Sequence, residues 1–167
     1  MFLEFMRNNK VVAGLLTFIR IYLGYQWMTA GFGKITGGFD AGGFLQGSIA
    51  SGNIQGWWAV FLEKVAVPNA SMFSFVVMWG EFLVGIALIL GIFTSFSALM
   101  GITMNFAFLF SGTVSTNAQM VILTLFILVA GHNAGKYGLD RWVLPFIREY
   151  KFGKGQKDIK EKEIVVT

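Results

Sequence analysis

Two apolar stretches decide the fold: LLTFIRIYLG over residues 15–24 and VVMWGEFLVG over residues 76–85. Each lies within a run of about 20 mostly apolar residues, the length that an α-helix needs to cross the ~30 Å hydrocarbon core of a bilayer. Each run also carries one charged side chain near its middle, Arg20 in the first and Glu81 in the second. Placing a charge inside a bilayer costs free energy. These two residues are therefore the most informative about which side chains face the interior of the protein.

Composition excludes a soluble globular protein. Hydrophobic residues make up 55% of the 167 residues and charged residues only 13%, which is more apolar material than a soluble core of this size buries. The chain has no cysteine and one histidine, His132, which removes disulfides, thiol catalysis, thiolate metal sites and a bis-histidine haem. A haem held by His and Met stays open. We expect no metal site and no covalently bound cofactor.

The rest of the chain predicts an all-α polytopic membrane protein, a bundle of four transmembrane helices with an interfacial C-terminal helix. A single domain over residues 1–150 is expected, followed by a charged, disordered cytoplasmic tail over residues 151–167. The predicted spans, with a long outer loop over 32–71, are about 11–31, 72–92, 96–111 and 114–131.

The distribution of positive charge predicts the orientation. Eight of the 13 Lys and Arg residues follow residue 135, and Arg7 and Lys10 precede the first span. By the positive-inside rule both termini are cytoplasmic, and the charge describes topology rather than nucleic-acid binding. His132 is expected at the cytoplasmic end of the fourth span. Asp140 is expected to cap the interfacial helix that follows, and Arg141 to anchor at lipid headgroups.

Arg20 and Glu81 predict an ion pair inside the bundle. At ~1.5 Å per residue, Arg20 lies ~15 Å from the cytoplasmic start of its helix and Glu81 lies ~14 Å from the outer start of its own. Opposite charges at equal depth most simply neutralise each other. Two interpretations stay open: the pair only holds two helices in register, or it belongs to a polar ligand or proton site.

Helical spacing places further residues on the same faces. Trp27 and two glycines share a stripe with Arg20, and Asn105 falls on a stripe of the third span with Ser97 and Gly101. The small residues indicate close helix packing. For Asn105 an interhelical hydrogen bond competes with contact to a ligand.

Three segments resemble the DoxX family of small bacterial four-helix membrane proteins. They are Arg-x-x-x-Gly-x-x-Trp-x-x-x-Gly-x-x-Lys over residues 20–34, Glu-x-x-x-Gly-x-x-Leu-x-x-Gly over 81–91, and Gly-Lys-Tyr-Gly-Leu-Asp over 135–140. In the last segment Gly138 stands where the family commonly has Ser. The resemblance covers about residues 10–145 and implies a multi-pass protein of a bacterial or archaeal cell membrane.

The resemblance also implies a function. Relatives include the membrane subunit of an archaeal thiosulfate:quinone oxidoreductase, and many members have no assigned activity. The leading hypothesis is a membrane subunit that binds a quinone or similar redox-active lipophile and acts with a partner oxidoreductase. Its candidate ligand-binding residues are Arg20, Trp27, Lys34, Glu81 and Asn105. The alternative is a non-catalytic scaffold that recruits other membrane or redox proteins. Membrane lipids and further copies of the chain are expected partners in either case.

Overall fold

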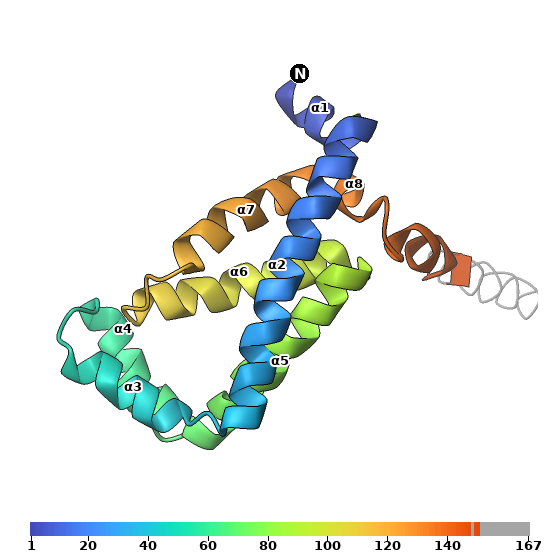
Figure 1. The fold of residues 1–167 in the computed structure, drawn as a ribbon. Coiled ribbons are helices and arrows are strands. Elements are labelled where there is room, and N and C mark those ends of the chain that lie inside the picture. The colour runs from blue at the N-terminus through green and yellow to red at the C-terminus, as the bar shows by residue number, and fades with distance from the viewer. Residues whose placement is uncertain (148, 151–167) are drawn as a thin grey trace, which may run out of the picture.

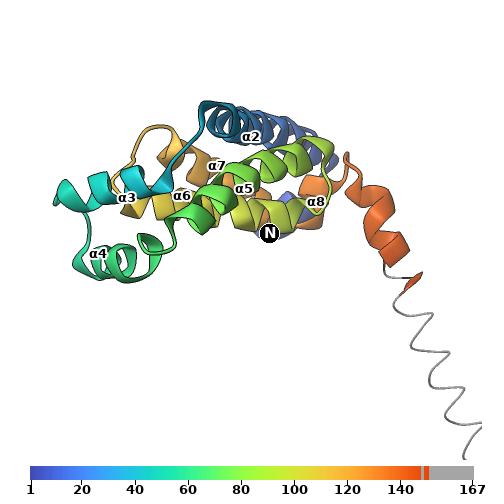
Figure 2. The ribbon, with the colours of Figure 1, turned by 90° about the horizontal axis from the view of Figure 1, so that it is seen from below.

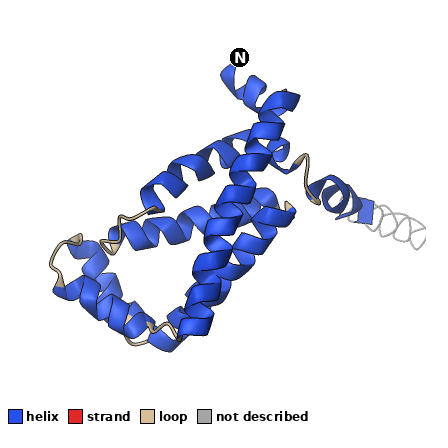
Figure 3. Cartoon of the chain, viewed as in Figure 1, coloured by secondary structure: helices blue, strands red, loops and turns tan. Residues whose placement is uncertain are grey.

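The computed structural model describes residues 1–147, 149 and 150, and every regular element in that part of the chain is helical (Figure 3). The elements are α1 (Phe2–Asn8), α2 (Lys10–Gly37), α3 (Ala41–Ala50), α4 (Gly56–Phe61), the π-helical turn η1 (Leu62–Ala66), α5 (Ala70–Leu90), α6 (Thr94–Phe110), α7 (Asn117–Ala130) and α8 (His132–Gly135). A further helical segment covers residues 140–147. The predicted all-α fold is confirmed. The tail predicted over 151–167 lies outside the described residues.

Two helices are long and apolar enough to cross a membrane: α2, with 28 residues, and α5, with 21. Both α6 and α7 are apolar but shorter, with 17 and 14 residues. All four coincide with the predicted runs, with shifted ends. The largest shift is in α2, which continues past the expected end at about residue 31 to Gly37 and therefore includes Lys34 in its last turn.

Helices α2 and α5 lie side by side in opposite directions (Figures 1 and 2). Glycines let their backbones touch: a Cβ atom added to Gly24 would lie 2.8 Å from the carbonyl oxygen of Gly85, and one added to Gly85 would collide with the backbone of Met28. A Cβ atom on Gly31 would likewise meet the backbone of Phe82. Such contacts between small residues replace the hydrophobic effect as the cause of helix association in lipid. They also fix which residues of α2 and α5 lie at the same height along the bundle.

The hairpin of α6 and α7 completes the bundle. The two helices pack against each other, and α7 also contacts α2. Large apolar side chains from α2, α5 and α7 meet in one buried cluster that includes Leu23, Trp27, Leu88 and Ile127. The bundle core therefore draws on helices from both halves of the chain.

The expected outer loop is largely helical and forms a cap on one end of the bundle, which we call the helical cap (residues 41–66) (Figure 1). Asp40 is the N-cap of α3, the first helix of this region. Its carboxylate accepts hydrogen bonds from the backbone N–H groups of Gly42 and Gly43 at 3.0 and 2.9 Å. A second apolar cluster, centred on Leu45 and Leu62, joins α3 to η1.

The first residues of the chain and the segment where α7 ends and α8 begins meet at the opposite end of the bundle. The Nε of Arg7 donates to the carbonyl oxygen of Val129 at 3.2 Å, and the side-chain amide of Asn133 donates to the carbonyl oxygens of Met6 and Asn9. The helical segment 140–147 then projects away from the bundle (Figure 2).

The contact of Gly85 with the backbone of α2 predicts that replacing two different glycines by alanine will have very different effects on stability. Gly85→Ala should lower the free energy of unfolding in detergent by about 2 kcal/mol or more, because its Cβ meets helix backbone that cannot move aside. The control is Gly33→Ala in α2, where nothing lies within 4 Å of an added Cβ atom. It should leave stability unchanged or raise it by up to ~1 kcal/mol. Equal effects of the two substitutions would contradict the helix contact.

Candidate functional site

Glu81 forms its ion pair with Lys34. The Nζ atom of Lys34 lies 2.8 Å from Oε1 and 2.6 Å from Oε2 of Glu81. Only 1% of the Glu81 side chain is exposed, whereas 26% of the Lys34 side chain is. The ammonium also lies over the rings of Phe39 and Phe108, at 5.6 and 5.5 Å from their centroids. The pair is therefore embedded on the carboxylate side and accessible on the ammonium side.

The ion pair predicted between Arg20 and Glu81 is wrong. The predicted depth of each residue was measured from the start of its own helix. The glycine contacts align the two helices differently, because Gly24 faces Gly85 and Gly31 faces Phe82. Arg20 lies nearer the start of α2, beside Gly91 at the end of α5. Glu81 therefore faces the late part of α2, within reach of Lys34.

Arg20 belongs to a junction at the opposite end of the bundle. Its side chain is 2% exposed, its guanidinium packs on Gly91 and Gly138, and its Nη1 donates to the carbonyl oxygen of Ala134 at 3.3 Å. The nearby carboxylate of Asp140 offsets its charge. Any side chain larger than hydrogen at Gly91 would collide with the guanidinium, and the φ of +66° at this residue favours glycine as well.

Asp140 caps α6, not the helical segment that follows it. Its two carboxylate oxygens accept hydrogen bonds from the backbone N–H groups of Phe93 and Thr94, at 2.6 and 2.9 Å. These groups begin α6, where a carboxylate is favourable because the first N–H groups have no partner within the helix. The backbone N–H of Asp140 in turn donates to the carbonyl oxygen of Gly91 at 2.8 Å. The cap predicted for the interfacial helix is therefore wrong, and Asp140 ties the chain after α8 to the turn between α5 and α6.

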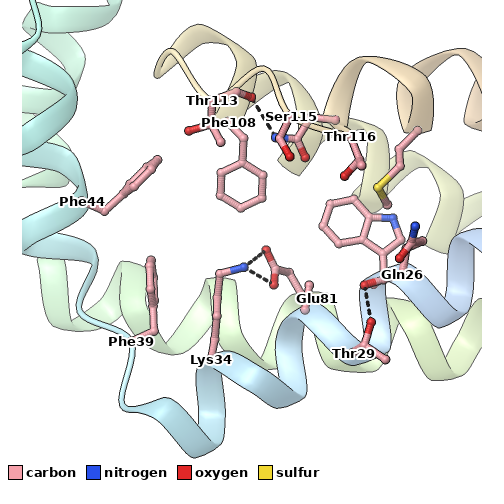
Figure 4. Close-up of a pocket in the computed structure, with 14 residues that line it drawn as sticks. Gln26, Thr29, Lys34, Phe39, Phe44, Glu81, Phe108, Thr113, Ser115 and Thr116 are labelled. Atoms are coloured by element: carbon pink, nitrogen blue, oxygen red, sulfur yellow. Dashed lines mark hydrogen bonds and ion pairs between the residues drawn. The ribbon is translucent and has the colours of Figure 1, made fainter.

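A cavity of about 470 Å³ opens beside the Lys34–Glu81 pair. Figure 4 shows the pair near its centre, with the rings of Phe39 and Phe44 on one side and the ring of Phe108 between the pair and the loop that joins α6 to α7. Lys34 and Glu81 are the charged residues of its wall, so the wall carries no net charge. The lining residues are Gln26, Trp27, Thr29, Ala30, Lys34, Phe39, Phe44, Glu81, Phe108, Thr113, Ser115, Thr116, Asn117 and Met120.

Of the five candidate ligand-binding residues, three line this cavity: Trp27, Lys34 and Glu81. Trp27 is 2% exposed, and its indole N–H has no hydrogen-bond acceptor within the described chain. Asn105 is fully buried and outside the lining, and neither atom of its amide has a partner among the described residues. The interhelical hydrogen bond expected for Asn105 is thus not formed. Arg20 lies in the junction described above.

The two remaining polar candidates lie near the other end. His132 is exposed at the start of α8, just past the end of α7, close to the position expected for it. Arg141 is exposed on the helical segment after the junction. Within residues 1–147, 149 and 150, neither takes part in the cavity.

Sequence reasoning missed the aromatic and hydroxyl parts of the cavity. Phe39, Phe44 and Phe108 come from three separate elements, and no short-range pattern connects them. The hydroxyls of Thr113, Ser115 and Thr116 lie in the loop between α6 and α7, although the fourth span was predicted to begin at about residue 114. One usable signal was present: Lys34 belongs to the same motif as Arg20 and offers a second cation for Glu81.

Together these features define an all-α protein with apolar helices of membrane-spanning character and a charged pair at a cavity beside its helical cap. The DoxX family profile matches residues 15–114, from α2 to the loop after α6. The chain therefore belongs to the DoxX family, whose members are membrane proteins. No curated protein and no solved structure matches the chain. The Gly-Lys-Tyr-Gly-Leu-Asp segment that forms the junction lies outside the matched residues.

The Lys34–Glu81 ion pair predicts that a second substitution restores the stability that the first one removes. Lys34→Met should lower the free energy of unfolding by about 3–5 kcal/mol, because it leaves the buried carboxylate of Glu81 without a cation. Lys34→Met combined with Glu81→Leu should recover most of that loss, since an apolar pair of similar volume avoids the desolvation cost. Both are measured by denaturant unfolding in detergent.

The control combines Arg20→Met with Glu81→Leu. This double variant should show no rescue, because Arg20 interacts with Asp140 and with the carbonyl oxygen of Ala134. Rescue by the Arg20 combination, together with none by the Lys34 combination, would contradict the pairing.

Proposed function

We propose that α2, α5, α6 and α7 all cross the membrane and that both termini lie on its cytoplasmic side. At ~1.5 Å per residue α6 and α7 are about 26 and 21 Å long, against a hydrocarbon core of ~30 Å, and α8 extends the chain beyond α7. The contacts of α1 with α7 and α8 support a common side for the two ends. Large apolar side chains exposed on all four helices, suited to contact with lipid, include Phe18, Phe75, Phe96 and Ile122.

We further propose that the cavity binds the ring of a quinone. The observation that carries this proposal is a wall with no net charge that combines three phenyl rings and the indole of Trp27 with an ammonium and several hydroxyls. A neutral, planar molecule with hydrogen-bond acceptors fits such a wall, whereas an ion would leave a charge of the wall unbalanced. An ammonium has three N–H donors, and the two oxygens of Glu81 leave at least one for a ligand carbonyl oxygen.

The residues suggest a division of chemical roles. Lys34 holds the quinone oxygen by a charge-assisted hydrogen bond. Glu81, in direct contact with Lys34, is placed to give or take the proton that accompanies reduction or oxidation of the ring. The unpartnered N–H of Trp27 is a second donor beside the cavity. A partner oxidoreductase supplies or accepts the electrons, and the chain acts as its membrane subunit.

A second candidate function is a non-catalytic membrane scaffold. The junction around Arg20 and Asp140 favours it, because there a buried charge serves helix assembly alone. A scaffold would need the Lys34–Glu81 pair only for stability. The stable double variant Lys34→Met with Glu81→Leu separates the two functions: a scaffold keeps its activity with this variant, and a quinone-binding subunit loses it.

Quinone binding can be measured by tryptophan fluorescence, to which Trp27 and four other tryptophans contribute. A water-soluble short-chain quinone added to the protein in detergent should quench the Trp27 part of this fluorescence to saturation, because the indole of Trp27 lines the cavity. Lys34→Met with Glu81→Leu should raise the dissociation constant about tenfold or more, equivalent to ~1.4 kcal/mol. Lys64→Met, which removes an exposed lysine of the helical cap, should leave it unchanged.

Trp27→Phe identifies the source of the signal, because it should remove the saturable part of the quenching. Quenching of the wild-type protein that rises linearly with quinone and never saturates would exclude a site in the cavity.

A further inference from the structure

A second, smaller cavity lies between the helical cap and the bundle. Its volume is about 80 Å³, and its walls come from α3, α4 and η1 on one side and from α5 and α6 on the other. We call it the apolar chamber. The residues that line it are Phe39, Ala41, Phe44, Leu45, Trp58, Phe61, Leu62, Ala66, Phe73, Val77, Ala107, Phe108 and Ser111.

The apolar chamber offers no free polar group. The only side chains in its wall with hydrogen-bonding atoms are Trp58 and Ser111, and they bond to each other, with the indole Nε1 donating to the hydroxyl oxygen at 2.9 Å. Water in such a chamber would have the hydroxyl of Ser111 as its one side-chain partner, whereas a buried water needs two or more polar groups. The chamber therefore suits a hydrocarbon group.

The apolar chamber and the larger cavity share a partition of three rings. Phe39, Phe44 and Phe108 line both spaces. The centroid of Phe44 lies 6.4 Å from that of Phe39 and 6.3 Å from that of Phe108, with the second contact edge to face. Figure 4 shows the three rings on the side of the cavity where Lys34 ends. A group attached to a ligand at Lys34 would therefore enter the chamber by passing between these rings.

We propose that the apolar chamber is a subsite for the alkyl or prenyl substituent of the ligand whose ring binds at the Lys34–Glu81 pair. The proposal rests on the proposed quinone-binding function and specifies the class of quinone: one with a branched hydrocarbon chain next to the ring. About 10–15 Å³ of such volume holds one water, so the chamber of about 80 Å³ admits a group of about five to eight non-hydrogen atoms. One isoprene unit, with its five carbon atoms, fits this range, and two units exceed it.

The test compares quinones that share one ring and carry no substituent, one isoprene unit or two. Their dissociation constants are measured in detergent from the saturable part of the quenching of tryptophan fluorescence. Wild-type protein should bind the singly prenylated quinone about tenfold more tightly than the bare ring, because hydrocarbon surface is removed from water. The second unit should add little further affinity, since the chamber is full.

Ala107→Leu fills the apolar chamber from α6 and should remove the gain from the first isoprene unit, while it changes the affinity for the bare ring by less than about twofold. Val77→Phe fills the same space from α5 and serves as a second variant if Ala107→Leu does not fold. The control, Ala118→Leu, makes the same change at an exposed position of α7 and should keep the full gain.

The possible results separate the subsite from the proposed function. If the bare ring binds to wild-type protein but prenylation adds nothing, the subsite is excluded while quinone binding stands. An equal gain in the wild-type, Ala107→Leu and Val77→Phe proteins would also exclude it, since the chain would then lie in detergent or lipid. If no quinone binds to wild-type protein, the proposed function fails, and the subsite with it.

Discussion

A carboxylate in an apolar helix is stabilised by a nearby cation, and in this chain the contact between two helix backbones decides which cation that is. Gly24, Gly31 and Gly85 let α2 and α5 approach until backbone meets backbone, which leaves no freedom to slide one helix along the other. At that register Glu81 is level with the late part of α2, and Lys34 reaches it. The position of the cavity follows, because the pair forms part of its wall.

The buried charges serve different purposes at the two ends of the bundle. Arg20 and Asp140 have partners in the backbone itself: a carbonyl oxygen for the guanidinium and two N–H groups at the start of α6 for the carboxylate. Such bonds fix the chain, and the guanidinium packs closely on Gly91 and Gly138. Lys34 and Glu81 face each other next to open volume, under a helical cap that adds aromatic rings. Ligand chemistry is therefore proposed for the end with the cap, and assembly is assigned to the other end.

The sequence predicts the helices well and the site only in part. Apolar runs identify α2, α5, α6 and α7 because a helix in lipid has to satisfy its own backbone polar groups. The glycine faces also follow from spacing, but spacing within each helix says nothing about the level of one helix against another. Because the sequence does not give the relative height of the two helices, Glu81 was predicted to pair with Arg20, whereas it pairs with Lys34. Phe44 and Phe108 reach the cavity from distant segments, and only the folded chain brings them together.

The pairing of Glu81 is tested most directly by solid-state NMR on the protein in liposomes, with ¹⁵N in the lysine and arginine side chains and ¹³C in the glutamate carboxylates. The account predicts strong dipolar coupling between the Glu81 carboxylate carbon and one lysine Nζ, as expected for nitrogen and oxygen within about 4 Å. This coupling should disappear in Lys34→Met. Coupling of that carbon to the guanidinium nitrogens of Arg20 would contradict the account.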